Sequence, residues 1–260
     1  MKISDAYHAF ITGGANGIGL AIAQVLASRG VKVTLADVDE TGLDEAVRAS
    51  GGGFGARRLD TRDRDGWAVA KAAAESAFGP VDILVNNAGI APDGRRFAEM
   101  DPASFDRIVG INLTGVFNGV SAFAGDMQER RRGHIVNTSS MAGISPGFPG
   151  LGAYAAAKFG VVGLSETLRA EMAPHGVGVS ILCPGFVPTR LEETTRRLGG
   201  QLREGGGRIP PGALGADIVA EKVLDGIERD LPYIITHPDN WPRVEQRHIV
   251  LREAFGATQA

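Results

Sequence analysis

Ala9-Phe10-Ile11-Thr12-Gly13-Gly14-Ala15-Asn16-Gly17-Ile18-Gly19 is the stretch of sequence that decides the fold. Its first four residues predict a short buried strand, and the helical pattern Leu20 to Arg29 follows the glycines. Glycines allow a tight turn that approaches a ligand closely, and a helix start offers free N–H groups to a phosphate. The spacing is Gly-x3-Gly-x-Gly, not the commoner Gly-x-Gly-x-x-Gly. The flanking strand and helix nevertheless predict a turn that binds a pyrophosphate.

Strand and helix patterns alternate along the rest of the chain. Further strands are predicted at Val31 to Ala36, Gly53 to Leu59, Val81 to Val85, His134 to Thr138, Val177 to Cys183 and Tyr233 to Thr236. Helices are predicted near Asp63 to Phe78, at Ile218 to Arg229 and over most of Asn240 to Phe255. This order predicts an α/β fold, a doubly wound, parallel, seven-stranded Rossmann-like sheet in three α/β/α layers. We expect a single domain over residues 1–260, because no linker-like stretch divides the chain.

Composition excludes several classes of protein. The net charge of −3 gives no reason to expect nucleic acid, and the basic run Arg130 to Arg132 reads as a helix end. Cys183 is the single cysteine, so it forms no intramolecular disulfide and is expected in the core. No cluster has the spacing of metal ligands. No run resembles a signal peptide or approaches a membrane span, so a cytoplasmic location is expected.

Asp37 ends the second predicted strand, eighteen residues after Gly19. A carboxylate at this place in a dinucleotide site meets the adenosine ribose hydroxyls and repels a 2′-phosphate. Neither Ala15 nor Asn16 in the turn is basic. These residues favour NAD over NADP, with a helix N-cap or turn carboxylate as the alternative for Asp37. Asp60 and the run Asn86 to Gly89 also close strands, although each alone fits ordinary turn chemistry.

Tyr154 and Lys158 lie four residues apart on a predicted helix and therefore on one face. A free tyrosine has a pKa of about 10, and lowering it by about 3 units requires roughly 4 kcal/mol. An exposed ion pair supplies less, so a second positive charge, such as an oxidised nicotinamide ring, would help. Asn112 is an amide inside an apolar helix and needs partners there, with its own helix backbone as one alternative. The Ser139-Ser140 pair follows the fifth strand.

Together these residues resemble the short-chain dehydrogenase/reductase family, classical type, from Ala9 to about Thr236. The matching pieces are Thr12-Gly13-x3-Gly17-x-Gly19, Asn86-Asn87-Ala88-Gly89, Asn112, Ser140, Tyr154-x3-Lys158 and Pro184-Gly185. The resemblance implies that Tyr154 is the acid/base and that Ser140 hydrogen-bonds the same substrate oxygen. It also implies that Lys158 binds the nicotinamide ribose and lowers the pKa of Tyr154, while Asn112 holds a water of a proton relay. The hydride passes directly between the substrate carbon and nicotinamide C4.

The resemblance also implies the residues that bind the cofactor, taken to be NAD. They are Gly13, Asn16, Gly17, Ile18, Gly19, Asp37, Asp60, Thr61, Asn87, Ala88, Gly89, Tyr154, Lys158, Pro184, Gly185, Val187 and Thr189. The glycine turn would meet the pyrophosphate, Asp60 and Thr61 the adenine, and Val187 and Thr189 the carboxamide. Whether Asn86 or Asn87 faces the cofactor stays open.

One spacing departs from the family pattern. The family serine stands thirteen residues before the tyrosine, whereas Ser140 stands fourteen before Tyr154. We infer one extra residue in the loop Gly143 to Ala153. Met141 has no hydroxyl, so Ser140 is preferred, with Ser139 as the alternative.

Apolar segments surround the expected nicotinamide site, namely Ile90 to Phe97, Ile144 to Leu151 and Phe186. They favour a hydrophobic secondary alcohol or its ketone, aromatic and alicyclic ones included, over a free sugar. The piece Tyr233 to Pro238 also looks like bacterial family members that oxidise side-chain alcohols of aromatic compounds. A lid is expected around 189–212.

An excess of arginine in this lid could attract an acidic substrate or merely solvate a helix. Its charged residues are Arg190, Arg196, Arg197, Arg203 and Arg208 against Glu192, Glu193 and Glu204.

The sequence thus predicts an NAD-dependent alcohol dehydrogenase. The alternatives are an NADP-dependent ketone reductase and a non-catalytic NAD-binding regulatory protein. The resemblance further implies a homotetramer, or less often a homodimer, built through the helices that contain Asn112 and Tyr154.

Overall fold

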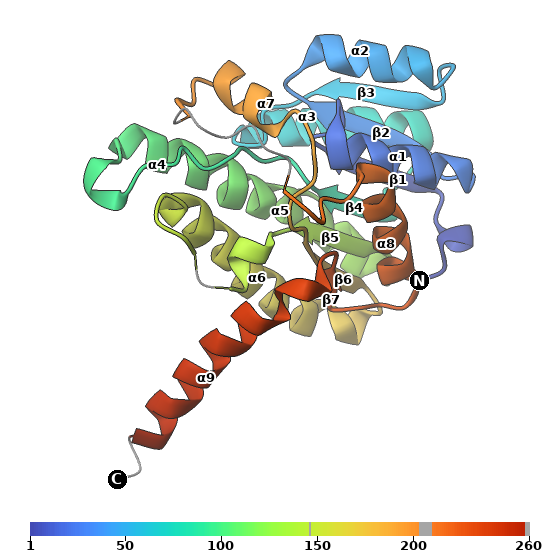
Figure 1. The fold of residues 1–260 in the computed structure, drawn as a ribbon. Helices are drawn as coiled ribbons and strands as arrows, with labels where there is room; N and C mark the ends of the chain where they lie inside the picture. Colours follow the sequence, from blue (N-terminus) through green and yellow to red (C-terminus); the bar gives the residue numbers. More distant parts are fainter. Residues whose placement is uncertain (146, 203–209, 258–260) are drawn as a thin grey trace.

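A parallel sheet of seven strands forms the centre of the part of the chain described by the computed structural model, residues 1–145, 147–202 and 210–257. The strands follow the order β3-β2-β1-β4-β5-β6-β7 (Figure 1). They are β1 (His8–Thr12), β2 (Lys32–Asp37), β3 (Phe54–Arg58), β4 (Ile83–Asn86), β5 (His134–Thr138), β6 (Gly178–Cys183) and β7 (Tyr233–Ile235). Each strand end lies within two residues of the position predicted from the sequence. The structure confirms the doubly wound α/β fold.

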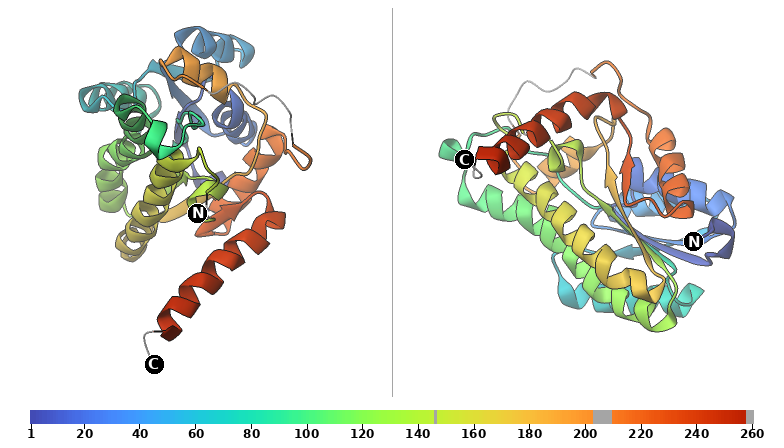
Figure 2. Two further views of the ribbon diagram at one scale, coloured as in Figure 1. Left: turned by 60° about the vertical axis from the view of Figure 1, so that its left-hand side comes forward. Right: turned by 90° about the horizontal axis from the view of Figure 1, so that it is seen from below.

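Helices cover both faces of the sheet and make the three predicted layers (Figures 1 and 2). They are α1 (Gly17–Ser28), α2 (Glu40–Ala49), α3 (Arg64–Phe78), α4 (Pro102–Val109), α5 (Gly115–Arg130), α6 (Gly152–Met172), α7 (Leu191–Arg197), α8 (Ala216–Glu228) and α9 (Trp241–Ala257). α1 and α8 pack together on one face, while α3, α5 and α6 pack on the other. A π-helical turn, Gly110–Thr114, joins α4 to α5.

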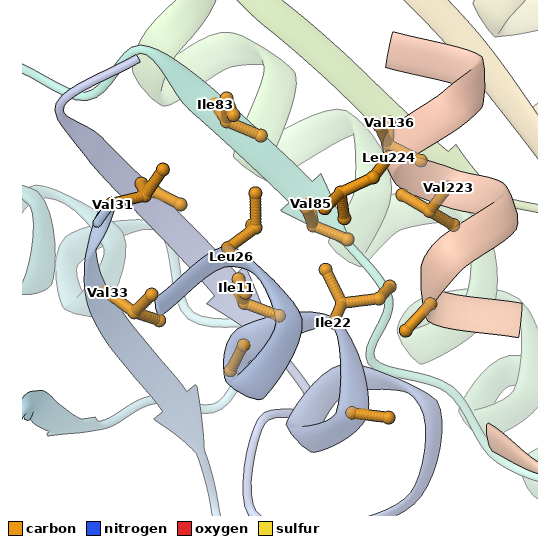
Figure 3. Close-up of a cluster of buried hydrophobic side chains, with 14 of the residues drawn as sticks. Ile11, Ile22, Leu26, Val31, Val33, Ile83, Val85, Val136, Val223 and Leu224 are labelled. Atoms are coloured by element: carbon orange, nitrogen blue, oxygen red, sulfur yellow. The ribbon is translucent and has the colours of Figure 1, made fainter. Parts of the chain in front are cut away.

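Both faces of β1 are buried, as expected for a parallel sheet with helices on either side. Ile11 points to the face where Ile22 of α1 and Leu224 of α8 gather (Figure 3). Phe10 points to the opposite face, where its ring centroid lies 5.9 Å from that of Trp67 and 5.1 Å from that of Phe123. The two-residue alternation therefore anchors β1 on both sides, and the turn after Thr12 starts from a fixed point.

The chain reverses its winding direction at β1, which lies between β2 and β4 in the sheet. The chain runs from β1 outward through β2 and β3, and then returns to β4 on the other side. The loops after β1 and β4 consequently diverge at the carboxyl edge of the sheet. A crevice opens at such a point in doubly wound sheets, and this fold has its cleft there.

The continuous helical run Pro102–Arg130 is long and apolar enough, by length and composition, to cross a membrane. The sequence-based expectation that no run approaches a membrane span was wrong in this respect, because the π-helical turn continues the helix through Asn112. Half of the apolar window is buried inside the fold. Contacts of α4 with α6, and of α5 with α3, account for this burial and make the run a core helix.

The last helix, α9, extends away from the body of the molecule (Figures 1 and 2). Near its start Val244 is buried in a cluster with Met141, Val162 and Cys183. The Arg243 guanidinium lies 4.1 Å from the centroid of the Phe148 ring. Cys183 is thus a buried core residue, as predicted.

Candidate active site

The cleft at the carboxyl edge of the sheet has a volume of about 1250 Å³. It runs from the loop after β2 to the loop after β6, with α7 along its rim. Nearly all of the predicted site residues line it: Gly13, Asn16, Gly17, Ile18, Asp37, Asp60, Thr61, Asn87, Ala88, Gly89, Ser140, Tyr154, Lys158, Pro184, Gly185, Val187 and Thr189. Gly19 and Asn112 are absent from the lining. They contact residues that belong to it, Gly13 in the case of Gly19 and Ile90 in the case of Asn112.

The glycine turn needs its glycines for two different reasons. Gly13 and Gly17 have φ angles of +64° and +57°, a conformation that side chains disfavour. Gly19 has no such angle, but a Cβ there would lie 2.2 Å from Gly13 O. Gly19 therefore lets α1 pack against the turn, and its predicted contact with a cofactor stays a prediction. Asn16 makes no side-chain capping hydrogen bond, so it leaves the positive end of α1 facing the cleft.

Thr12 ties the glycine turn to the loop after β4. Its hydroxyl oxygen accepts hydrogen bonds from Asn87 N at 2.9 Å and Ala88 N at 3.1 Å. Asn87 Nδ2 donates to Thr12 O at 3.1 Å, and Asn87 lines the cleft. Asn86 is buried and donates to Asn137 Oδ1 at 2.9 Å, away from the cleft. The choice that the sequence left open is thus resolved, and Asn87 is the residue that faces the cleft.

Asp37 is buried at the end of β2 with both carboxylate oxygens in hydrogen bonds. Oδ2 accepts from Ala15 N and Oδ1 from Asp39 N, each at 3.1 Å. Burial raises the pKa of Asp37, and the backbone donors at Asp39 and Ala15 oppose the rise. Asp39, rather than Asp37, caps α2 by accepting from Gly42 N at 3.2 Å. The N-cap part of the alternative for Asp37 was therefore wrong, whereas its turn part is confirmed, because Asp37 Oδ1 accepts from the amide two residues further on.

Asp60 lines the same end of the cleft in an ion pair with Arg62, 2.6 Å between Nη2 and Oδ2. This guanidinium lowers the pKa of the Asp60 carboxyl. The Thr61 side chain packs against Gly115, where a Cβ would lie 2.6 Å from Thr61 Oγ1. These contacts hold the Asp60 and Thr61 side chains at this end of the cleft.

Ser140 and Tyr154 meet in the cleft although the sequence spacing between them is unusual. The Ser140 hydroxyl accepts a hydrogen bond from Ala142 N at 3.1 Å and lies close enough to the Tyr154 hydroxyl to act against the rise in its pKa. Ser139 is buried and donates to Lys158 O at 2.8 Å. Ser140 is therefore the serine that reaches the tyrosine, and Ser139 holds α6 in place. Residue 146, within the loop assigned the extra residue, lies outside the described residues.

Lys158 lies one helical turn after Tyr154, as predicted, with its Nζ 5.6 Å from the Tyr154 ring centroid. The ammonium donates to Thr138 O at 2.9 Å, and burial lowers the pKa of Lys158 to about 8. Desolvation raises the pKa of Tyr154, and the Ser140 hydroxyl opposes that rise. Desolvation dominates at the phenol in the chain without cofactor, so the lowering of the Tyr154 pKa by Lys158 stays a prediction for the cofactor-bound site. A further positive charge is needed, as the sequence argument anticipated.

Asn112 is fully buried within the π-helical turn. Its Oδ1 accepts from Ile90 N at 2.8 Å, and its Nδ2 donates to Ile90 O at 3.0 Å. The amide thus pairs with another segment and not with its own helix. A Cβ on Gly89 would lie 3.0 Å from Asn112 Oδ1 and 3.7 Å from Lys158 Nζ. Asn112 therefore holds the loop after β4 against the lysine.

The described part of the lid contains α7, which bridges two sides of the cleft. Thr195 Oγ1 accepts a hydrogen bond from Ala91 N at 2.9 Å. Arg197, the last residue of the helix, forms an ion pair with Asp39, which lowers the pKa of that carboxyl. The sequence pattern did not predict either contact. Arg203, Glu204 and Arg208 of the predicted lid lie outside the described residues.

Comparisons with known proteins agree with this geometry. The family model described as short chain dehydrogenase matches residues 7–198. The chain therefore belongs to the short-chain dehydrogenase family.

Two relatives and one solved structure illustrate the range of the family. The chain is 37% identical to trans-4-hydroxycyclohexanecarboxylate dehydrogenase of Sinomonas cyclohexanicum, over 84% of this chain and 82% of that one. It is 32% identical to the probable oxidoreductase EphD of Mycobacterium tuberculosis over 85% of this chain, but spans only 39% of that protein. The structure of a short chain dehydrogenase/reductase from Burkholderia phymatum in complex with NAD has a TM-score of 0.88 and 35% identity, covering 98% of this chain and 97% of that one.

The cleft fits the nicotinamide cofactor of this family. The glycines leave no room for side chains where a pyrophosphate would approach, since a Cβ on Gly17 would lie 3.0 Å from Thr189 Cγ2. Asp37 lies at one end of the cleft and Tyr154 with Lys158 at the other, so an extended dinucleotide can reach both. Within the described residues, no group of three or more His, Cys, Asp or Glu side chains could hold a metal ion.

Proposed function

We propose that this protein is an NAD-dependent dehydrogenase that interconverts a hydrophobic secondary alcohol and its ketone. The observation that carries the proposal is the lining of the cleft beside Tyr154. Its apolar residues are Ile90, Ala91, Pro92, Ile111, Phe186, Leu191 and Leu198, and its charged residues Arg190, Glu192, Glu193 and Arg196 all lie in or beside α7. An apolar pocket favours a substrate that it can desolvate without leaving polar groups unpaired.

The charges at the Asp37 end of the cleft support NAD over NADP. A 2′-phosphate placed at the adenosine ribose would meet the Asp37 carboxylate, with Glu45 also in the lining. Arg197 could attract such a phosphate, but its guanidinium is already paired with Asp39 and lies near Glu193. The Burkholderia phymatum structure contains NAD, which agrees with this choice.

The residues of this chain divide the chemistry between them. Bound NAD⁺ would accept the hydride, and its positive ring would lower the pKa of Tyr154. Ser140, whose oxygen already accepts from Ala142 N, is free to donate its proton to the substrate oxygen or to Tyr154. Tyr154 takes the hydroxyl proton as the general base, and returns it when a ketone is reduced. Lys158, with a pKa of about 8, can release a proton near neutral pH, while Asn112, whose amide is paired with Ile90, would hold the loop after β4 beside the lysine.

A substrate panel tests the proposal by NADH absorbance. It compares cyclohexanol, 1-phenylethanol and trans-4-hydroxycyclohexanecarboxylate, the compound in the name of the Sinomonas relative, with a free sugar as control. We expect turnover of the ring alcohols with NAD and its loss in Tyr154→Phe. Turnover of the sugar alone, or equal turnover with NADP, would contradict the proposal. Binding of NAD without any turnover would favour the regulatory alternative.

A carboxylate on the substrate is a second candidate feature, favoured by Arg190 and Arg196 in the lining of the cleft. Arg196 is 3.6 Å from Glu192 in an exposed ion pair, so its charge is partly balanced. If the carboxylate is recognised, trans-4-hydroxycyclohexanecarboxylate will have a lower KM than cyclohexanol, and Arg190→Gln will remove the difference.

The assembly and the location of the protein stay predictions. A homotetramer through α5 and α6 would cover Phe117, whose side chain is 48% exposed on α5. Phe117→Asp should then shift the mass measured by light scattering, whereas an unchanged mass would contradict this contact. The expected cytoplasmic location is untested.

A further inference from the structure

His237 contacts the backbone of Gly185, a residue that lines the proposed nicotinamide end of the cleft, and is itself absent from the lining. It stands two residues after β7, next to the carboxyl end of β6, where the Pro184–Thr189 segment begins. Its Nδ1 accepts a hydrogen bond from Gly185 N at 3.1 Å. The contact is tight, because a Cβ on Gly185 would lie 2.6 Å from His237 Cγ.

Two groups lie within hydrogen-bond distance of Nδ1 of His237. Besides Gly185 N, they include Thr236 Oγ1 at 2.6 Å, and that hydroxyl is itself 3.2 Å from Gly185 N. Nδ1 can accept from the amide only if it carries no proton, so the bond to Gly185 requires a neutral ring with its hydrogen on Nε2. Nε2 is buried and has no hydrogen-bond partner. A buried donor without a partner is unfavourable, and in a native structure such a group calls for an explanation.

The other side of the same segment is held beside the catalytic serine. Met141 N donates to Pro184 O at 2.9 Å, and Met141 directly follows Ser140. Pro184, Gly185 and Val187 all line the cleft. The segment is therefore fixed between the Ser140 side and the His237 ring, and a shift of either would move the surface that meets the nicotinamide.

We propose that His237 is a positioning residue for nicotinamide binding, which acts by holding Gly185 N–H through its unprotonated Nδ1. The inference rests on the proposed function only in placing a nicotinamide at this end of the cleft. It assigns His237 no contact with substrate or cofactor. An apolar residue would avoid the unpartnered Nε2–H but would remove one of the two acceptors of Gly185 N and leave it Thr236 Oγ1 at 3.2 Å.

Two ligands that differ by the nicotinamide test the proposal. NADH contains it, while ADP-ribose keeps the adenosine, pyrophosphate and second ribose. Calorimetry should show NADH affinity reduced on the order of tenfold in His237→Leu, the equivalent of one lost hydrogen bond, with ADP-ribose affinity nearly unchanged. His237→Asn should restore most of the NADH affinity, because its Oδ1 can take the place of Nδ1. The control variant is His175→Leu. His175 precedes β6 and therefore lies at the amino ends of the strands, opposite the cleft, so this substitution should change neither affinity.

Equal losses of NADH and ADP-ribose affinity would indicate a merely structural role, and no loss would show that the bond is dispensable. Either result overturns the proposal. If His237→Leu fails to fold, Gly185→Ala provides a second test, because its Cβ would displace the ring and should weaken NADH selectively. Failure of every alcohol in the substrate panel would leave this binding comparison intact. A wild-type protein that binds ADP-ribose and NADH equally would refute the positioning role by itself.

Discussion

Replacing Lys158 by Met should stabilise the protein while abolishing its activity. Burial lowers the pKa of Lys158 from 10.5 to about 8, so keeping this ammonium charged in the folded protein costs about 3 kcal/mol at neutral pH. The methionine removes that cost and keeps most of the apolar stem. It also leaves Thr138 O without its lysine donor, a loss of about 1 kcal/mol. The expected net gain in the free energy of unfolding is about 2 kcal/mol at pH 7.

The difference between Lys158→Met and the wild type should depend on pH with a definite sign. Below pH 8 the lysine is protonated in both the folded and unfolded states, so the full cost applies. Between about 8 and 10.5 the unfolded wild type binds more protons than the folded one, and wild-type stability therefore rises relative to the variant. Urea denaturation without cofactor at pH 7 and pH 10 measures this difference. A less stable variant at pH 7, or a difference that does not change with pH, would refute the reasoning.

Five further substitutions test separate parts of the site. Tyr154→Phe should lower kcat by roughly 10²- to 10⁴-fold with NADH binding retained. A kcat close to that of the wild type would exclude the acid/base role of Tyr154. Asp37→Ala should shift selectivity toward NADP on the order of tenfold in kcat/KM, so unchanged selectivity would contradict the cofactor assignment. Ser140→Ala should reduce kcat far more than Ser139→Ala, which should mainly lower the melting temperature. Gly19→Ala should lower the free energy of unfolding by about 1–3 kcal/mol, because its Cβ would lie 2.2 Å from Gly13 O; a urea midpoint equal to wild type would argue against that packing.

The sequence predicted those parts of the site that depend on local order along the chain. The glycine turn, Asp37 and the Tyr154–Lys158 pair follow from strand ends and helical spacing, and the sheet brings them to one edge. Ser140 was preferred over Ser139 despite the unusual spacing from Tyr154. The structure agrees, because the Ser139 hydroxyl is already bonded to Lys158 O. Periodicity and turn chemistry act over a few residues, and these features need no more than that.

Features that depend on distant contacts were not predicted. The pairing of Asn112 with Ile90, the ion pair of Arg197 with Asp39 and the burial that sets the pKa of Lys158 each join segments that no spacing rule relates. The role of Gly19 shows the same limit, because a glycine that faces a ligand and one that faces Gly13 O look alike in sequence.

The π-helical turn Gly110–Thr114 also affects how the chain can change its length. A π turn contains one more residue than an α turn, so deleting a single residue there would yield an unbroken α-helix with no lost backbone bond. The deletion would leave the helices on its two sides in nearly the same relative rotation, because one π turn with i→i+5 bonds would be replaced by one α turn with i→i+4 bonds. α5 could therefore keep Phe123 against Phe10. The effect of the extra residue is local to the turn itself, where Asn112 pairs with Ile90, so a deletion there would test that contact separately from the packing of α5.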